Sequence, residues 1–350
     1  MDRSWSPWTC ATLVPMTSFA EHAALRRAWH GVVRSEDLTD RPVAVRLCGV
    51  DVVVWRSGDG VGDVAAAPDR CPHREAPLSN GTIVDGLLEC PYHGWSFDGG
   101  GRCALIPSSG LGAPVPSKAH LQCVQVQERY GLVWIALEEP AAPLPDIGYD
   151  RDPAYRRIVE PMQEWHCAAT RMVDNFCDVA HFPWVHTGTF GAASERVVAP
   201  VTLEQIGDFF GWRYEVQAAN DGAGAVASGQ STPTVERSMT TGFCLPLLVR
   251  STISYPATGL DHILLLVSTP IDDERSLFTF IVWRNDDHSV PIDDVIAFDR
   301  AIGAEDKRML ETVRGTLRLD ALGLLNTQAD RASVEWRRRL RLLMEAADAG

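Results

Sequence analysis

Two Cys/His pairs lie within one short segment, residues 71–95 (CPHREAPLSNGTIVDGLLECPYHGW), and they limit what this chain can be more than any other feature. Cys71 and His73 are separated by one residue, Cys90 and His93 by two, and 16 residues lie between the pairs. The segment is rich in Pro, Gly and Asn, so we expect it to form loops. Thiolate and imidazole ligands in this number suit zinc or an iron–sulfur cluster. Unrelated buried cysteines and surface histidines are the alternative, but chance is a weak explanation for both pairs in one loop-rich segment.

The order of the ligands separates zinc from an iron–sulfur cluster. Zinc sites with two Cys and two His usually place both thiols before both imidazoles. Here each pair holds one Cys and one His, which suits a [2Fe–2S] cluster with two Cys on one iron and two His on the other. The pattern therefore favours this Rieske type of centre, with zinc as the alternative.

The length and charge of the chain argue against several classes of protein. At 350 residues the chain is too long for one ordinary core, so we expect two domains. A formal charge of −14 argues against a nucleic-acid partner, since phosphate binding requires a basic face. No apolar run approaches the roughly 18 residues of a membrane span. The N-terminus lacks the layout of a signal peptide, so we expect a cytoplasmic protein whose nine cysteines are thiols or metal ligands.

The distribution of strand and helix patterns predicts an α+β protein with two domains, residues 1–145 and 146–350. Residues 42–138 alternate β-branched segments with tight turns, which predicts a small antiparallel β domain that carries the Cys/His loops. Residues 139–160 are rich in Pro and Asp and are expected to be the linker. For the second half we expect strands over 200–285, a helix over 164–182 that Pro183 ends, and helices over 292–315 and 336–346.

A second group of candidate ligands lies in residues 175–186, NFCDVAHFPWVH. On a helix, Asn175, Asp178 and His181 would be spaced i, i+3 and i+6 and would share one side. His186 follows the proline, where the chain can turn back. Two histidines and a carboxylate on one face of iron form the facial triad of Fe(II) oxygenases. Taken alone, the pattern more often forms a solvated helix face with an i,i+3 pair, and this alternative stays open.

The carboxylate of such a triad is expected further along the chain. In residues 293–313 the apolar side chains form a helical stripe. Asp306 falls inside that stripe, where a buried charge needs a partner or a metal. Asp299 lies near the edge of the stripe and is the alternative ligand. A salt bridge from Asp306 to a nearby Arg is the other interpretation.

Together these motifs resemble the Rieske non-haem iron oxygenases. The resemblance covers nearly the whole chain and rests on CPHREAPLSNG, CPYHGWSFDGGGRC, ERYGLVW, DNFCDVAHFPWVHTGTFG and AIGAEDKRMLET. It implies an α+β fold with an N-terminal Rieske antiparallel β domain and a C-terminal helix-grip-like catalytic domain, which is an antiparallel sheet with covering helices. In the family's pattern Cys71 and Cys90 hold one iron of the cluster, and His73 and His93 hold the other.

The resemblance also implies a mononuclear Fe(II) site, whose ligands would be His181, His186 and Asp306. Asn175 would lie near this iron without binding it. Asp178 would accept a hydrogen bond from the Rieske histidine His93 of a neighbouring subunit, so that electrons pass from the cluster through Asp178 to the iron. The substrate pocket is expected to be apolar, and its candidate lining residues are Phe176, Phe182 and Phe298.

In function, the chain resembles the oxygenase (alpha) components, most of all the single-subunit-type aromatic O- and N-demethylases and natural-product hydroxylases. This implies O₂-dependent monooxygenation of a small aromatic or polycyclic substrate, by hydroxylation or oxidative demethylation. Electrons would come from a separate ferredoxin or flavin reductase that uses NAD(P)H. A homotrimer would bring the cluster of one subunit near the iron of the next. Two alternatives stay open, namely an electron carrier with a scaffold as its second domain and a zinc-stabilised binding module.

Overall fold

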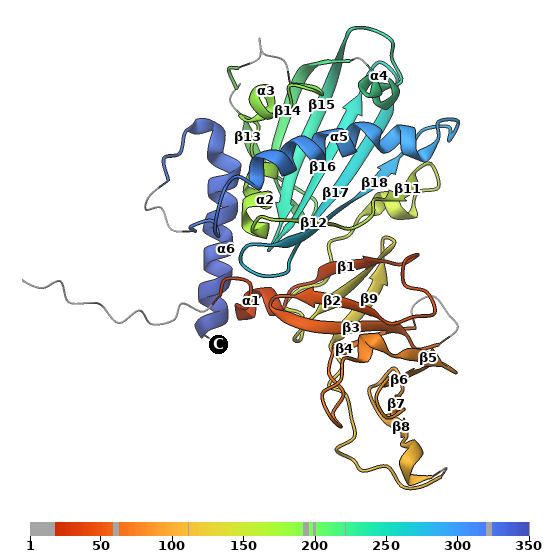
Figure 1. Cartoon of the computed structure of the whole chain (residues 1–350). Helices are drawn as coiled ribbons and strands as arrows, with labels where there is room; N and C mark the ends of the chain where they lie inside the picture. The colour runs from red at the N-terminus through yellow and green to blue at the C-terminus, as the bar shows by residue number, and fades with distance from the viewer. Residues whose placement is uncertain are drawn as a thin grey trace, which may run out of the picture.

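The chain was examined as a computed structural model, which describes residues 18–349 except 59–62, 111, 192–195, 199–200, 221 and 320–323. The N-terminal segment in which the sequence shows no signal-peptide layout lies outside the described residues. Three small sheets form the lower part of the molecule, and one large sheet with helices forms the upper part (Figure 1). The predicted α+β fold is therefore confirmed. Within the described residues, no helix is both long and apolar enough to cross a membrane.

The small sheets are antiparallel and come from the first part of the chain. One three-stranded sheet has the order β2 (Val43–Leu47), β3 (Val50–Arg56) and β4 (Val64–Pro68), and the other has β1 (His30–Arg34), β10 (Leu132–Ala136) and β9 (Gln125–Arg129). A four-stranded sheet follows the chain as β5 (Thr82–Val84), β6 (Leu87–Glu89), β7 (Ser96–Phe97) and β8 (Cys103–Leu105). A tight turn at Cys48 and Gly49 joins β2 to β3 with positive φ at both residues, as a type I′ hairpin requires.

The large sheet has eight strands and confirms the strands expected over 200–285. Its order is β11-β18-β17-β16-β15-β14-β13, every neighbouring pair is antiparallel, and β12 pairs with β18 outside this path. The strands are β11 (Arg156–Val159), β12 (Gln163–Trp165), β13 (Thr202–Ile206), β14 (Phe209–Ala219), β15 (Thr234–Cys244), β16 (Leu248–Tyr255), β17 (Leu260–Pro270) and β18 (Ser276–Arg284).

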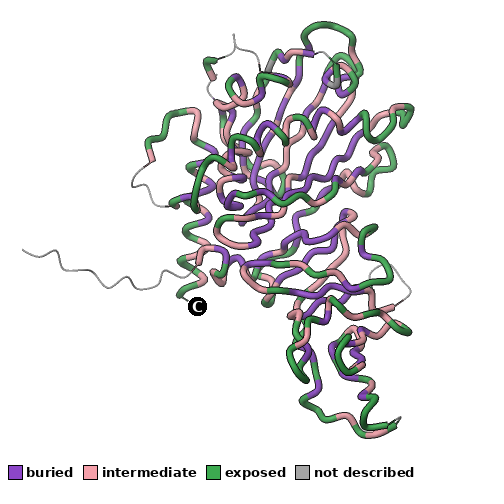
Figure 2. Tube along the Cα trace, viewed as in Figure 1, coloured by how far each residue is buried: buried purple, intermediate pink, exposed green. Residues whose placement is uncertain are grey.

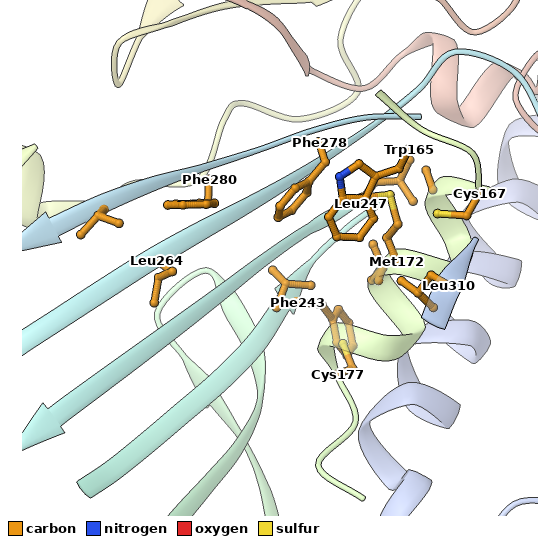
Figure 3. Packing of buried hydrophobic residues seen from close by; sticks show 14 of the residues in the cluster. Trp165, Cys167, Met172, Cys177, Phe243, Leu247, Leu264, Phe278, Phe280 and Leu310 are labelled. Atoms are coloured by element: carbon orange, nitrogen blue, oxygen red, sulfur yellow. The ribbon is translucent and has the colours of Figure 1, made fainter. Parts of the chain in front are cut away.

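Helices cover one face of this sheet. They are α2 (Ala169–Phe176), α3 (Phe182–Val185), α4 (Ala223–Ser228), α5 (Ile292–Leu310) and α6 (Arg331–Ala349). Helix α1 (Ala23–Arg26) lies beside the small sheets and contacts α6 (Figure 1). Short 3₁₀ turns occur elsewhere in the chain, at Leu78–Asn80, Pro107–Ser109, Gly148–Arg151 and Gln328–Asp330. Helix α5 crosses the face of the sheet, and α6 stands beside it (Figure 1). Figure 3 shows the core between the sheet and these helices, which includes Phe278 of β18, Trp165 of β12, Met172 of α2 and Leu310 of α5.

The other face of the large sheet packs on the small sheets. Trp134 of β10 and Trp283 of β18 belong to one buried cluster, in which Tyr130 packs edge-on against Trp283 with ring centroids 5.5 Å apart. The Thr269 hydroxyl donates a buried hydrogen bond of 2.6 Å to the Gly31 carbonyl across this boundary. Burial accordingly runs through the strands of both parts, whereas exposed residues gather in the loops (Figure 2). One face of the large sheet is therefore covered by the small sheets, and a site can form only between its other face and the helices.

Candidate metal centres

The two Cys/His loops lie side by side in the part with the small sheets. Cys71 follows β4 and Cys90 follows β6, and both thiols are buried in the same small core. Their histidines are exposed, with the rings of His73 and His93 only 4.5 Å apart between centroids. Trp95 stacks flat on His73 at 4.6 Å. The structure therefore brings the four predicted cluster ligands together, with sulfur inside and imidazole outside.

Backbone hydrogen bonds shape these loops for a bound group. The Glu75 N–H donates to the Cys71 carbonyl, and the Gly94 N–H donates to the Cys90 carbonyl, so each loop closes as a tight turn. Gly94 has a φ of +69°, which favours glycine at this point of the turn. Burial raises the pKa of the Cys71 thiol to about 11, although backbone N–H groups counter the shift. A thiolate here needs a cation beside it, and the irons of a cluster supply that charge.

The second group of predicted ligands converges above the large sheet. The Nε2 atoms of His181 and His186 lie 3.2 Å apart. Asp306 Oδ1, from α5, lies 3.6 Å from the first nitrogen and 3.5 Å from the second. Within the described part of the chain this is the one group of three or more such side chains with ligand atoms all within 4.8 Å. Asp299, the alternative carboxylate, is not in it and contacts His262 instead.

A carboxylate lies behind each histidine of this trio. The His181 Nδ1–H donates to Asp178 Oδ2 at 2.9 Å, and the His186 Nδ1–H donates to Glu305 Oε2 at 3.2 Å. Such hydrogen bonds fix the tautomer, so each Nε2 keeps its lone pair toward Asp306. Asn175 completes the arrangement by donating from its amide to Asp306 Oδ1 at 3.0 Å. The donor set fits a divalent iron with three protein ligands.

The charges at this site also fit a bound cation. Burial and the nearby His181 lower the pKa of His186 to about 4, which keeps the imidazole neutral and able to bind a metal. Burial raises the pKa of Asp306, and His181 and Asn175 only partly counter it. Burial alone would also raise the pKa of Asp178, but hydrogen bonds from His181 and from the Ala180 N–H bring it below its ordinary value. A cation among these groups would relieve the cost of the buried Asp306 charge.

The expected single helix over 164–182 is wrong. Helix α2 ends at Phe176, and α3 begins only at Phe182, so Asn175, Asp178 and His181 do not share one helix face. The Asp178 carboxylate accepts the backbone N–H groups of Ala180 and His181, each at 3.0 Å. This local pairing competes with the helical hydrogen bonds and turns the chain. The turn aims His181 at His186, which a straight helix would not do.

Glu305 is a residue of the site that the apolar stripe of its helix does not predict. Its carboxylate contacts residues 186–189, the segment that follows α3. There it is buried and also accepts the Gly188 N–H at 2.8 Å and the Thr189 hydroxyl at 2.7 Å. Only the fold brings residues 186–189 to this carboxylate, so a pattern within α5 could not reveal it.

A mostly apolar cavity of about 100 Å³ opens beside the trio. The predicted residues Phe176 and Phe182 line it, as do Leu264 and Leu266 of β17. Phe298 is not among the lining residues, although its ring lies 6.3 Å from that of Phe190, which does line the cavity. The polar groups in the wall come from the trio, from Asp299 and from Thr241 and Ser251, whose hydroxyls are 2.9 Å apart.

Comparison with known proteins agrees with both centres. The Rieske [2Fe-2S] domain family matches residues 28–123, and the vanillate O-demethylase oxygenase C-terminal domain family matches residues 165–346. Methylxanthine N1-demethylase of Pseudomonas putida is 30% identical over 94% of this chain and 92% of its own length. The oxygenase component of dicamba O-demethylase of Stenotrophomonas maltophilia is 41% identical over 46% of this chain and 48% of its own.

Solved structures extend the likeness to the whole fold. The Pseudomonas putida enzyme NdmA, solved with caffeine, superimposes with a TM-score of 0.82 at 29% identity and covers 93% of each chain. These relatives are oxygenase components that carry a Rieske cluster, and their family uses a mononuclear iron in the second domain. They give no support to an electron carrier with a scaffold domain or to a zinc-stabilised module. The chain therefore belongs to the Rieske non-haem iron oxygenases, as the terminal oxygenase component of an O₂-dependent oxidoreductase.

Proposed function

We propose that this enzyme removes a methyl group from nitrogen or oxygen, or hydroxylates a carbon, on a small aromatic substrate held in the cavity beside α5. The observation that carries the proposal is the position of His181, His186 and Asp306 in the wall of a mostly apolar cavity. The named relatives include methylxanthine, dicamba and vanillate demethylases, which favours demethylation. An oxidised methyl group would leave as formaldehyde.

The residues of this chain divide the work. His181, His186 and Asp306 would bind the mononuclear Fe(II), which when bound activates O₂ with electrons from the cluster. Asp178 and Glu305 would hold the two histidines in the tautomer that exposes Nε2, and Asn175 would hold the Asp306 carboxylate. The aromatic and aliphatic wall would orient the substrate and keep bulk water from the reacting carbon.

We further infer a homotrimer in which the cluster of one subunit serves the iron of the next. Within one chain, the Cys/His loops belong to the part with small sheets, while α2 and α3 lie beside the large sheet (Figure 1). Asp178 would accept a hydrogen bond from His93 of the partner subunit, whose ring is exposed. Head-to-tail contacts of this kind can close into a ring, and the resemblance to the family implies a ring of three subunits. Light scattering of the purified protein tests this, since a monomer would leave the cluster without its acceptor.

Cluster ligation and location complete the proposal. Cys71 and Cys90 would hold one iron of the cluster, and His73 and His93 the other. Electrons would come from a separate ferredoxin or flavin reductase. We place the enzyme in the cytoplasm, because none of the eight cysteines in the described part of the chain forms a disulfide, as is typical of a reducing compartment.

Turnover with a reductase tests the proposed function. Iron-loaded protein is mixed with a Rieske reductase, NADH and a panel of N-methyl and O-methyl aromatic compounds, and O₂ uptake and formaldehyde are measured. We expect formaldehyde in proportion to O₂ for at least one compound, and none from Asp306→Ala. Hydroxylated product without formaldehyde would assign the hydroxylase branch. Absence of any substrate-dependent O₂ uptake, with a reducible cluster, would refute the proposal.

A further inference from the structure

Asp299 is a buried carboxylate that lines the cavity and that no step described so far uses. It lies on α5, seven residues before Asp306, which places the two about 10 Å apart along the helix. One oxygen, Oδ2, accepts a hydrogen bond of 3.0 Å from His262 Nε2. The other, Oδ1, has no hydrogen-bond partner among the described residues. An ionised carboxylate accepts up to four hydrogen bonds, so half of this group is free.

The surroundings of His262 make its Nε2 a hydrogen-bond donor to Asp299 and not an acceptor. Its other nitrogen, Nδ1, lies 3.5 Å from Nη1 of Arg284, in a region where both side chains are buried. A guanidinium has donors only, so the Nδ1 that faces it carries the lone pair and Nε2 carries the hydrogen. Arg284 in turn donates to Asp286 at 2.9 Å. The Nε2–H group is therefore the donor and Asp299 Oδ2 the acceptor of the bond between them.

Arg284, the arginine beside His262, is already paired with Asp286. Asp286 also accepts from Arg156 Nη2 at 2.5 Å, so two arginines share this carboxylate, and none of the three residues lines the cavity. Asp299 shares the cavity wall with apolar side chains and with Thr241 and Ser251. A free anionic oxygen in such surroundings binds a hydrogen-bond donor strongly and repels a second anion.

We propose that Asp299 determines specificity: its free oxygen binds an N–H or O–H donor of the substrate, so that the enzyme accepts aromatic compounds with an amine, amide or hydroxyl group and rejects carboxylates. The inference rests on the proposed function, since it takes the same cavity as the substrate site. The spacing along α5 places the donor at one end of an aromatic ring and the carbon to be oxidised at the other, near Asp306.

Equilibrium binding tests this without turnover. Four single-ring probes share a methoxy group and differ at the opposite carbon, namely 4-methoxybenzylamine, 4-methoxybenzyl alcohol, 4-methylanisole and 4-methoxybenzoate. Each is titrated calorimetrically into the iron-loaded full chain under nitrogen, with no reductase present. We expect the amine to bind roughly ten- to a hundredfold more tightly than 4-methylanisole, as a hydrogen bond to a charged group does. The benzoate should bind more weakly than 4-methylanisole.

The variant Asp299→Asn should remove most of the advantage of the amine and leave 4-methylanisole unchanged. Asp294→Asn is the matched control, because it removes one carboxylate from an exposed position of the same helix and should keep the advantage. If Asp299→Asn does not fold, the wild-type series still decides. Tighter binding of the benzoate than of the amine, or failure of the amine to bind at millimolar concentration, would overturn the proposal. Formaldehyde assays judge the proposed function separately, since binding preference and turnover can fail independently.

Discussion

Replacing Glu305 by Gln isolates the role of the carboxylate behind His186. The carboxylate accepts three hydrogen bonds, from His186 Nδ1, the Gly188 N–H and the Thr189 hydroxyl. A glutamine amide keeps one oxygen and gains a donor nitrogen. The oxygen is required at Gly188, because a backbone N–H cannot accept, whereas the Thr189 hydroxyl can rotate to accept. The amide nitrogen therefore faces His186.

A donor at Nδ1 selects the wrong tautomer of His186. The hydrogen of the neutral ring moves to Nε2, which can then no longer offer a lone pair to a metal. Loss of such an orienting partner typically costs ten- to a hundredfold in metal affinity, or about 1.4–2.7 kcal/mol. We expect Glu305→Gln to bind Fe(II) weaker by this factor, while its cluster absorption equals that of the wild type.

Anaerobic calorimetry with Fe(II), on protein whose cluster is loaded, measures the loss. Glu311→Gln is the matched control, since Glu311 is the C-cap of the same helix and contacts the His166 N–H and Lys307 rather than the histidines of the trio. Wild-type affinity for Fe(II) in Glu305→Gln would show that Glu305 does not set the tautomer of His186. An equal loss of affinity in both variants would assign the loss to the removal of a negative charge alone.

Three further predictions follow from other parts of the structure. Asp306→Ala should lose the mononuclear iron and keep the visible spectrum of the cluster, because the two centres use different loops; metal analysis together with absorption would reveal a joint loss instead. Burial raises the pKa of Asp174 to about 6, above the roughly 4 of an unfolded carboxyl. Because the native state then binds more protons between these pH values, its stability falls as pH rises from about 4 to about 6. Asp174→Asn should flatten this fall when melting temperature is measured against pH, and an unchanged slope would contradict the assignment. Trp212→Phe removes the hydrogen bond of 3.0 Å from Nε1 to the Cys177 carbonyl and leaves that buried carbonyl unpaired, so urea unfolding should show a loss of about 1–3 kcal/mol, whereas the exposed Trp184→Phe should change little.

The ligand residues could be predicted from sequence because metal sites require rare residue types at fixed spacing. Cys71, His73, Cys90 and His93 stand out in any context, and the structure places them together. Asp306 was predicted from the apolar stripe of its helix together with the family resemblance, and it lies beside both histidines. Metal chemistry limits both the kind of side chain and its burial, so these signals survive without a structure.

Residues that act through tertiary contacts gave no such signal. Glu305 and His262 each meet partners more than thirty positions away in sequence, as the separations of 119 and 37 residues show. The turn at Asp178 was missed because a side chain that accepts backbone N–H groups ends a helix that propensity alone would continue. Phe298 was misplaced because one residue along a helix rotates a side chain by about 100°, so that Asp299 lines the cavity and Phe298 does not.

Anomalous diffraction at the iron edge, from crystals of protein purified without oxygen, tests the central claim most directly. We expect iron density at the Cys71/Cys90 loops and a separate iron within bonding distance of His181 Nε2, His186 Nε2 and the Asp306 carboxylate, with Asp178 and Glu305 still hydrogen-bonded to the far sides of the two rings. Absence of iron between these three side chains would contradict the assignment of the mononuclear site. A signal at the zinc edge, both there and at the Cys/His loops, would contradict the assignment of both centres.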